Sequence, residues 1–121
     1  MVKKILIVDD NQDILYTIEK ALLNDGYEVE KAISGNECLQ YLNSSIPDLI
    51  LLDIMMPEID GWDVASKIKE NSQWKKVPIV FVTAKNDDMS IRLGTLGSND
   101  YIIKPFEIGE LLKTVRKILI D

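Results

Sequence analysis

The chain has 121 residues, of which 46% are hydrophobic and 28% charged, and these proportions are typical of one globular domain. No apolar run approaches the roughly 18 residues that a membrane span needs, and the absence of histidine excludes Ser-His-Asp catalysis and histidine-bound zinc or haem. The net charge of −6 is concentrated in residues 1–60, which hold 4 Lys and Arg against 12 Asp and Glu, and this acidity argues against nucleic acid as a direct partner.

Short apolar runs alternate along the chain with segments whose apolar residues recur at helical spacing. The most apolar run, 48–53, predicts a central strand that is buried on both faces. Gly26 suits the end of a helix, residues 34–37 form a capping box, and Asp60 suits a helix N-cap. The predicted strands are 5–8, 27–32, 48–53, 78–83 and 101–103, and the predicted helices are 14–22, 34–42, 60–68, 87–96 and 108–119.

This alternation of strands and helices predicts an α/β domain with a doubly wound five-stranded parallel sheet, which we expect to span residues 1–121. Right-handed crossovers place helices on both faces of such a sheet, and ligands bind outside the carboxyl ends of its strands. The residues that end the predicted strands therefore indicate the site. They are Asp9 and Asp10, Asp53, Thr83 and Ala84, and Lys104 and Pro105.

Three carboxylates that meet at one edge of a sheet repel one another and raise one another's pKa, so a cation is expected beside them. Mg²⁺ is the natural candidate, because it prefers oxygen ligands and is commonly held by carboxylates together with phosphate oxygens. Thr83 can donate a hydrogen bond to a bound anion, and Lys104 can balance the anion's charge. These residue types together predict a phosphoryl-transfer site in which an aspartate can act as the nucleophile.

Four short motifs of the chain resemble the signature of a known protein family. They are Asp9-Asp10, Asp53, Thr83-Ala84 and Lys104-Pro105-Phe106, in this order and at the ends of predicted strands. The family is the response-regulator receiver domains of two-component signalling, and its loop after the phosphorylated aspartate is also similar to residues 55–61. The resemblance covers essentially the whole chain and implies a flavodoxin-like (βα)₅ fold with strand order 2-1-3-4-5.

The resemblance implies that Asp53 is the aspartate that accepts a phosphoryl group. It implies that Asp10 binds Mg²⁺ directly and that Asp9 acts largely through water. Asp53 and the backbone carbonyl of Met55 would complete the protein's ligands to the metal. Met55 lies two residues after Asp53, and Lys85 lies two residues after Thr83. These positions tune dephosphorylation in the family, so the lifetime of the phosphorylated state stays open.

Further roles follow from the same resemblance. Lys104 resembles the lysine that pairs with the phospho-accepting aspartate or its phosphate, and a cis peptide bond is implied between Lys104 and Pro105. Thr83 resembles the switch hydroxyl that binds the phosphoryl group. Tyr101 matches the aromatic residue that changes rotamer, although a half-buried core aromatic is the plainer interpretation. Phosphorylation would then remodel the face formed by the fourth helix, the fifth strand and the fifth helix.

Other residues also have plain structural interpretations. Asp9 and Asp10 can simply cap the first helix, since aspartate is a preferred N-cap residue. Cys38, the single cysteine, excludes an internal disulfide and is expected to pack within a helix rather than to sense redox state. We expect Trp62 and Trp74 to lie at the surface or its rim and assign them no chemistry.

Two other functions are compatible with this class of fold. A small phosphatase with an aspartate nucleophile usually has a second acid or base two residues later, where this chain has Met55. A flavin or dinucleotide carrier lacks support, because no Gly-x-Gly-x-x-Gly motif follows the first strand. We expect a phosphorylation-dependent switch instead, which is not an enzyme beyond catalysing its own phosphorylation and dephosphorylation.

The absence of histidine also bears on partners, because the chain cannot donate a phosphoryl group from a histidine of its own. A histidine kinase or a histidine phosphotransfer protein must then supply it. The output would be a downstream protein target or an effector domain, with a phosphorylation-dependent homodimer as a further option and with no direct contact to nucleic acid or membrane. We expect a cytoplasmic protein, either acting alone or as the receiver of a longer regulator.

Overall fold

The computed structural model of the chain describes residues 2–84 and 100–120. The predicted helix 87–96 and Lys85 lie outside these described residues. Within them, the structure has five strands and four helices. They are β1 (Lys4–Val8), α1 (Gln12–Asn24), β2 (Glu28–Ala32), α2 (Gly35–Leu42), β3 (Leu49–Leu52), α3 (Gly61–Glu70), β4 (Ile79–Ala84), β5 (Asp100–Lys104) and α5 (Ile108–Leu119).

The strands form one parallel sheet in the order β2-β1-β3-β4-β5, which confirms the predicted topology. In the sheet's register, Leu6 of β1 lies between Glu30 of β2 and Ile50 of β3. All four residues of β3 are buried, as the continuous apolar run predicted for a central strand. The edge strand β2 instead exposes charged residues, which is a common protection against pairing with another chain.

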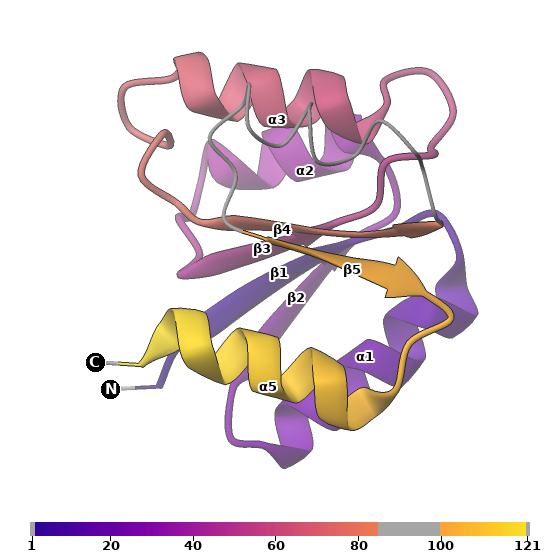
Figure 1. The fold of residues 1–121 in the computed structure, drawn as a ribbon. Coiled ribbons are helices and arrows are strands. Elements are labelled where there is room, and N and C mark those ends of the chain that lie inside the picture. The colour runs from indigo at the N-terminus through magenta and orange to yellow at the C-terminus, as the bar shows by residue number, and fades with distance from the viewer. Residues whose placement is uncertain (1, 85–99, 121) are drawn as a thin grey trace.

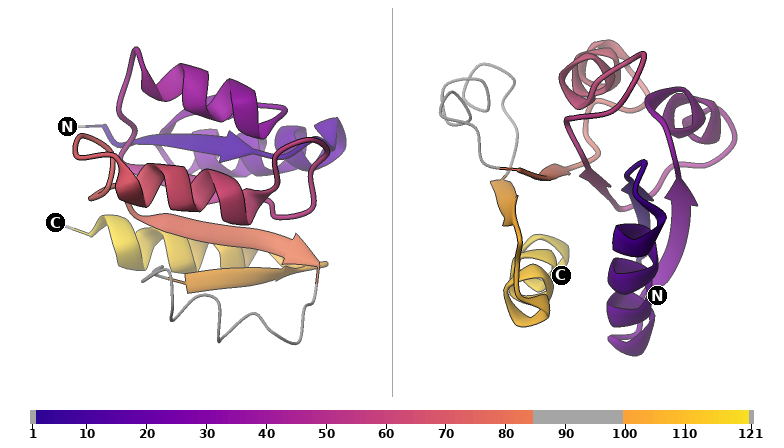
Figure 2. Two further views of the ribbon diagram at one scale, coloured as in Figure 1. Left: turned by 90° about the horizontal axis from the view of Figure 1, so that it is seen from above. Right: turned by 90° about the vertical axis from the view of Figure 1, so that its right-hand side faces the viewer.

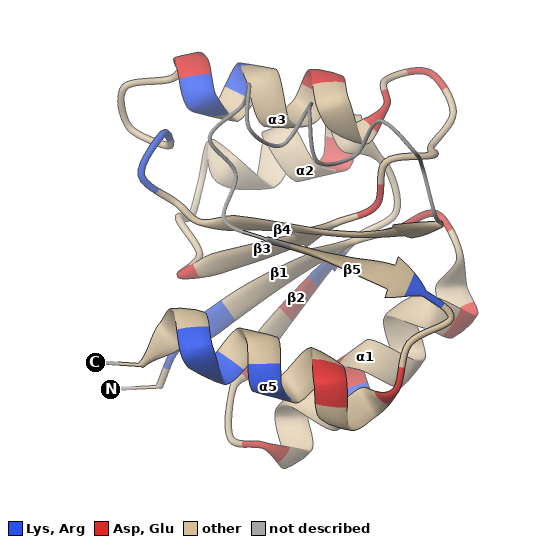
Figure 3. Ribbon diagram, in the orientation of Figure 1, with Lys and Arg blue, Asp and Glu red and all other residues tan. Residues whose placement is uncertain are grey.

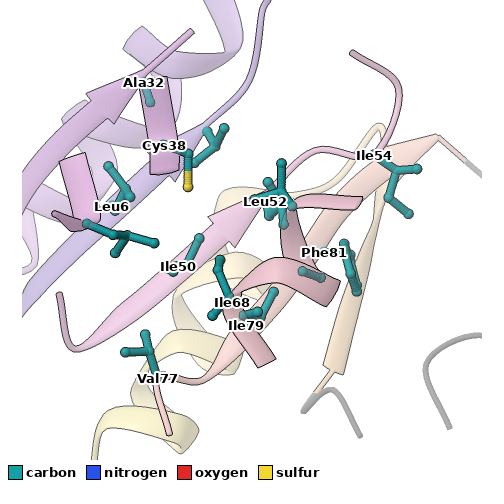
Figure 4. Close-up of a cluster of buried hydrophobic side chains, with 14 of the residues drawn as sticks. Leu6, Ala32, Cys38, Ile50, Leu52, Ile54, Ile68, Val77, Ile79 and Phe81 are labelled. Carbon is teal, nitrogen blue, oxygen red and sulfur yellow. The ribbon is translucent and has the colours of Figure 1, made fainter. Parts of the chain in front are cut away.

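Helices cover both faces of the sheet (Figures 1 and 2): α2 and α3 lie on one face, and α1 and α5 on the other. Successive side chains of a strand point to opposite faces, so each central strand contributes to two hydrophobic clusters. Leu6 and Ile50 belong to the cluster beneath α2 and α3, which Figure 4 shows, whereas Ile7 and Leu51 belong to the cluster against α1 and α5. The sheet is thus fixed from both sides, and its strand ends are held in place.

The helix ends follow the predicted signals closely. Asp60 caps α3 by accepting a hydrogen bond from the Asp63 amide at 2.9 Å, and Gly26 adopts a φ of 94° just after α1. Ser34 caps α2 through the Glu37 amide at 3.1 Å. The cap of α1, by contrast, is Asn11 rather than either preceding aspartate, and this leaves both aspartates available to the site.

Trp62 contradicts the expectation of a surface position. Its side chain is only 7% exposed and its ring lies 4.7 Å from the Phe81 ring, centroid to centroid. It occupies the second position of α3, where the helix packs onto β4. Trp74 is partly buried at the rim, as expected. In the described part of the chain, no helix combines the length and the apolar character needed to cross a bilayer.

Candidate metal and phosphoryl site

The predicted site residues converge at the carboxyl edge of the sheet. Asp9 directly follows β1, Asp53 directly follows β3, Thr83 is the penultimate residue of β4, and Lys104 ends β5. All strands run parallel, so these ends meet at one edge, and Figure 3 shows acidic segments there beside the basic tip of β5. The structure therefore brings together residues that are up to 95 positions apart in the sequence.

Three carboxylates form a compact acidic cluster at this edge. Asp9, Asp10 and Asp53 each offer an oxygen, and these oxygens lie within 4.8 Å of one another. Asp9 is 2% exposed and Asp53 5% exposed, whereas Asp10 lies on the surface. Oxygen donors that converge in this way suit a hard divalent cation such as Mg²⁺, which keeps several waters and takes one or two carboxylates. Because Asp10 is exposed, the cluster borders on solvent at that carboxylate.

Lys104 bridges the two buried carboxylates. Its Nζ atom lies 2.6 Å from Oδ2 of Asp9 and 3.6 Å from Oδ1 of Asp53. The resemblance implied Asp53 as its partner, and the structure shows that Asp9 is the closer of the two. Two carboxylates with little access to water are costly unless a cation compensates them, and the ammonium group provides that compensation.

The carboxyl group of Asp53 has a raised pKa. Burial is the largest cause, because it disfavours the charged form, and the nearby negative charge of Asp9 acts in the same direction. Three contacts of Asp53 oppose the rise in pKa: the positive charge of Lys104, a hydrogen bond with the Thr83 side chain, and the hydrogen bond from the Ile54 amide. Because burial and Asp9 together outweigh these three contacts, a further cation beside Asp53 would stabilise its charged form.

Backbone hydrogen bonds orient both buried carboxylates. The Ile54 amide donates to Oδ1 of Asp53 at 2.9 Å, and the Asn11 amide donates to Oδ1 of Asp9, also at 2.9 Å. The amide of Asp53 itself donates to the Val8 carbonyl at 2.9 Å, which extends the pairing of β1 and β3 by one residue. These bonds fix the carboxylates before any ligand arrives.

The remaining predicted residues take distinct positions. Thr83 is 1% exposed and so lies inside the edge, whereas the Met55 side chain is 71% exposed. Tyr101 is 38% exposed and pairs in register with Phe81 of β4. The peptide bond between Lys104 and its proline is cis, as the resemblance implied.

Two further positions clarify the neighbourhood. Cys38 is fully buried, and burial raises the pKa of its thiol to about 12, so the packing role expected for it holds. Gly61 lies directly against the backbone of Asp53 and Ile54, a close approach that the sequence analysis did not identify. The available signal was a glycine at the first position of a helix just after a strong N-cap, where a better helix former is the usual choice.

The parallel sheet in 2-1-3-4-5 order, with carboxylates, a hydroxyl and a lysine gathered at its carboxyl edge, defines a flavodoxin-like domain. Residues 5–116 match the family model of the response regulator receiver domain. The chain belongs to this family, the receiver domains of two-component signalling.

Known relatives agree with this assignment. The response regulator ArlR of Staphylococcus saprophyticus is 40% identical over 117 residues, which cover 96% of this chain and 52% of that protein. A response regulator structure from Chloroflexus aurantiacus matches with a TM-score of 0.92 and 36% identity, covering 100% of both chains. The response regulator TrrA of Thermotoga maritima, in complex with Mg²⁺ and BeF, matches with a TM-score of 0.87 and 36% identity over 98% of this chain and 100% of that one.

The chain spans about half the length of the curated relatives that it matches, such as ArlR.

Proposed function

We propose that this receiver domain accepts a phosphoryl group on Asp53 in the presence of Mg²⁺ and that the modification alters a surface that regulates a partner. The observation that supports the proposal most directly is the cluster of Asp9, Asp10 and Asp53 beside the ammonium group of Lys104. The Mg²⁺ and BeF bound by the related TrrA structure support the same chemistry.

In this proposal, Asp9, Asp10, Asp53 and the Met55 carbonyl would hold Mg²⁺, with Asp9 acting largely through water. The bound ion would neutralise charge that develops on the transferring phosphoryl group. The residues of the chain have complementary tasks. The Ile54 amide orients the Asp53 carboxylate, and Lys104, at the end of β5 and 3.6 Å from that carboxylate, would reach the incoming oxygens.

The proposed transfer is a displacement at phosphorus. A carboxylate oxygen of Asp53 forms the new P–O bond as the P–N bond of a phosphohistidine donor breaks, and the leaving imidazole keeps the electron pair of that bond. The acyl phosphate that remains carries negative oxygens. Lys104 would pair with one of them, and the Thr83 hydroxyl would donate a hydrogen bond to another.

We propose that the switch follows from that last contact. Thr83, buried at the end of β4, has its side chain in a hydrogen bond with Asp53, and in this proposal it would move toward the phosphoryl group to donate to it. Tyr101, on the neighbouring strand β5, would then rotate inward. The affected face would comprise the helix expected at 87–96, β5 and α5, and a partner, an effector domain or a second copy would bind there.

The donor in this proposal is a histidine kinase or a histidine phosphotransfer protein, because the chain contains no histidine. We propose a cytoplasmic location for the protein and no direct contact with nucleic acid. We propose the whole of residues 1–121 as the receiver domain. The alternative of a turnover phosphatase is disfavoured by Met55, which cannot transfer a proton.

The proposal is tested by incubating the protein with acetyl phosphate and Mg²⁺ and measuring its mass. We expect the gain of one phosphoryl group, its loss in EDTA, and no gain in the Asp53→Asn variant. Continued labelling of that variant would place the nucleophile elsewhere, and steady hydrolysis of acetyl phosphate without a mass gain would favour the phosphatase.

A further inference from the structure

Gly61, the first residue of α3, packs directly on the peptide that carries Asp53. A Cβ atom at this position would collide with the carbonyl oxygen of Asp53 and would lie 2.7 Å from the Cα atom of Ile54. Both atoms belong to the backbone, so neither can move aside as a flexible side chain would. The approach therefore leaves room for glycine alone.

The helix cannot retreat easily from such a collision. Trp62, the next residue, is buried and packs against Phe81 of β4. Val64 and Ala65, on the same helix, are fully buried in the core cluster beneath α2 and α3. Moving the start of α3 outward would open a cavity in that cluster, which is costly. The strain would fall instead on the segment that follows β3.

That segment carries the proposed ligands. The Ile54 carbonyl accepts hydrogen bonds from the Met56 amide at 3.0 Å and from the Gly61 amide at 2.9 Å. The Ile54 amide, on the other side of the same residue, donates to the carboxylate of Asp53. A shift of Ile54 would therefore move the Asp53 carboxylate and the adjacent Met55 carbonyl together, relative to Asp9, which is held by separate bonds to Asn11 and Ala32.

We propose that Gly61 is a positioning residue for the phosphoryl-accepting segment. It holds the Asp53–Ile54 peptide at the distance from Asp9 and Asp10 that lets one cation be shared by the three carboxylates, with Asp9 acting largely through water. Mg²⁺ demands near-ideal octahedral geometry, so a displacement of a few tenths of an ångström is enough to weaken its binding. The inference rests on the proposed function, because it concerns the same metal and the same acceptor.

The test compares Gly61→Ala with two matched variants. Gly35→Ala places its Cβ 2.6 Å from a methyl of Val64 on α3, and 2.7 Å from a methyl and 3.1 Å from the carbonyl oxygen of Ile59 in the loop before α3. It therefore strains the packing of α2 against α3 and that loop, whereas the Asp53 peptide is not among its three nearest contacts. Gly109→Ala adds a methyl in the first turn of α5, where no atom of residues 2–84 or 100–120 lies within 4 Å. The three variants thus separate a strained site, a strained core and an unstrained surface.

Three quantities are measured for each folded variant: the free energy of unfolding in EDTA, the Mg²⁺ dissociation constant by calorimetry, and the rate of labelling by acetyl phosphate at saturating Mg²⁺. We expect Gly61→Ala to weaken Mg²⁺ binding and to slow labelling by about tenfold or more, because misplaced reacting groups lose rate steeply. Gly35→Ala is expected to lose stability but to bind Mg²⁺ and to label at close to the wild-type rate.

Each result decides between positioning and a general structural role. Equal losses of labelling in Gly61→Ala and Gly35→Ala, in proportion to stability, would overturn the proposal, and so would normal Mg²⁺ binding by Gly61→Ala. If Gly61→Ala is unfolded in buffer, all measurements are made in trimethylamine oxide, which favours the folded state. Failure to fold even there would make Gly61 a requirement of folding and would also overturn the proposal. Failure of the wild-type chain to label would instead reject the proposed function.

Discussion

The Nζ atom of Lys104 lies 2.6 Å from the Oδ2 atom of Asp9 and 3.6 Å from the Oδ1 atom of Asp53, the proposed phospho-acceptor. This pair joins the ends of β1 and β5, which lie on either side of β3 and β4 in the sheet order. It compensates one buried carboxylate of the acidic cluster while leaving Asp53 within reach. We therefore expect a cation or a phosphoryl group that enters the site to change the contacts of this lysine.

Removal of this ammonium group should expose the cost of the acidic cluster. We expect Lys104→Ala to lower the free energy of unfolding in EDTA by about 1–3 kcal/mol, because it leaves buried carboxylates without their charge partner. Adding Mg²⁺ should recover part of that loss, since the ion replaces the missing positive charge. Urea unfolding with and without Mg²⁺ measures both effects, and Lys67→Ala, on the exposed surface of α3, is the control. Unchanged stability in EDTA would contradict the compensating role.

Removal of a carboxylate from the same cluster should act in the opposite direction. Asp10 is exposed and adds negative charge beside Asp9 and Asp53. We expect Asp10→Ala to raise the free energy of unfolding in EDTA by up to about 1 kcal/mol, and by less at high salt, while phosphorylation is lost. Asp13→Ala is the matched control, because Asp13 lies in the first turn of α1, where a negative charge is favourable. A destabilised Asp10→Ala variant would argue against charge crowding.

The raised pKa of Asp53 predicts a pH dependence with a definite sign. The folded state keeps the proton of Asp53 to higher pH than the unfolded chain, whose aspartates titrate near about 3.9. The contribution of Asp53 to stability is therefore most favourable at low pH and is lost as the pH rises from the unfolded pKa through the raised folded value.

Comparison with Asp53→Asn isolates this effect, because the other carboxylates titrate in both proteins. We expect the variant to gain stability relative to the wild type as the pH rises through that window in EDTA. Urea unfolding at closely spaced pH values measures the difference. The quantity to follow is the free energy of unfolding of the variant minus that of the wild type. If this value stays constant or decreases as the pH rises, the pKa of Asp53 is not raised.

Thr83 and Tyr101 provide a test of the proposed switch. We expect Thr83→Ala to accept a phosphoryl group yet to lose most of the conformational response, because the response depends on a hydrogen bond made only in the phosphorylated state. The lost coupling should be about 1–3 kcal/mol. Tyr101→Ala should change the conformational output strongly and should change the extent of phosphorylation less.

Amide chemical shifts with and without beryllofluoride, a phosphoryl mimic, measure the response, with Thr17→Ala on α1 as the control. In the wild type we expect shifts that extend through residues 100–120. Shifts confined to the loops around Asp10 and Asp53 would reject the switch.

Much of the fold could be predicted from the sequence, because its signals are local. The unbroken apolar run of β3 indicated a strand buried on both faces, and Asp60 and Gly26 marked helix ends through bonds and dihedral angles within a few residues. The position of Asp53 just after that run also placed it at the edge of a sheet. The strand order itself came from resemblance, since periodicity says nothing about which strands are neighbours.

Only the tertiary structure decided which groups meet at that edge. Trp62 is buried because α3 turns it onto Phe81, a contact that its place in the sequence does not reveal. Lys104 contacts Asp9 more closely than Asp53, across 95 positions of sequence, and Gly61 lies against the Asp53 peptide. The sequence by itself determined the residue types and their places at strand ends. The distances between them depend on how strands, loops and helices pack against one another, and that packing is a property of the whole folded chain.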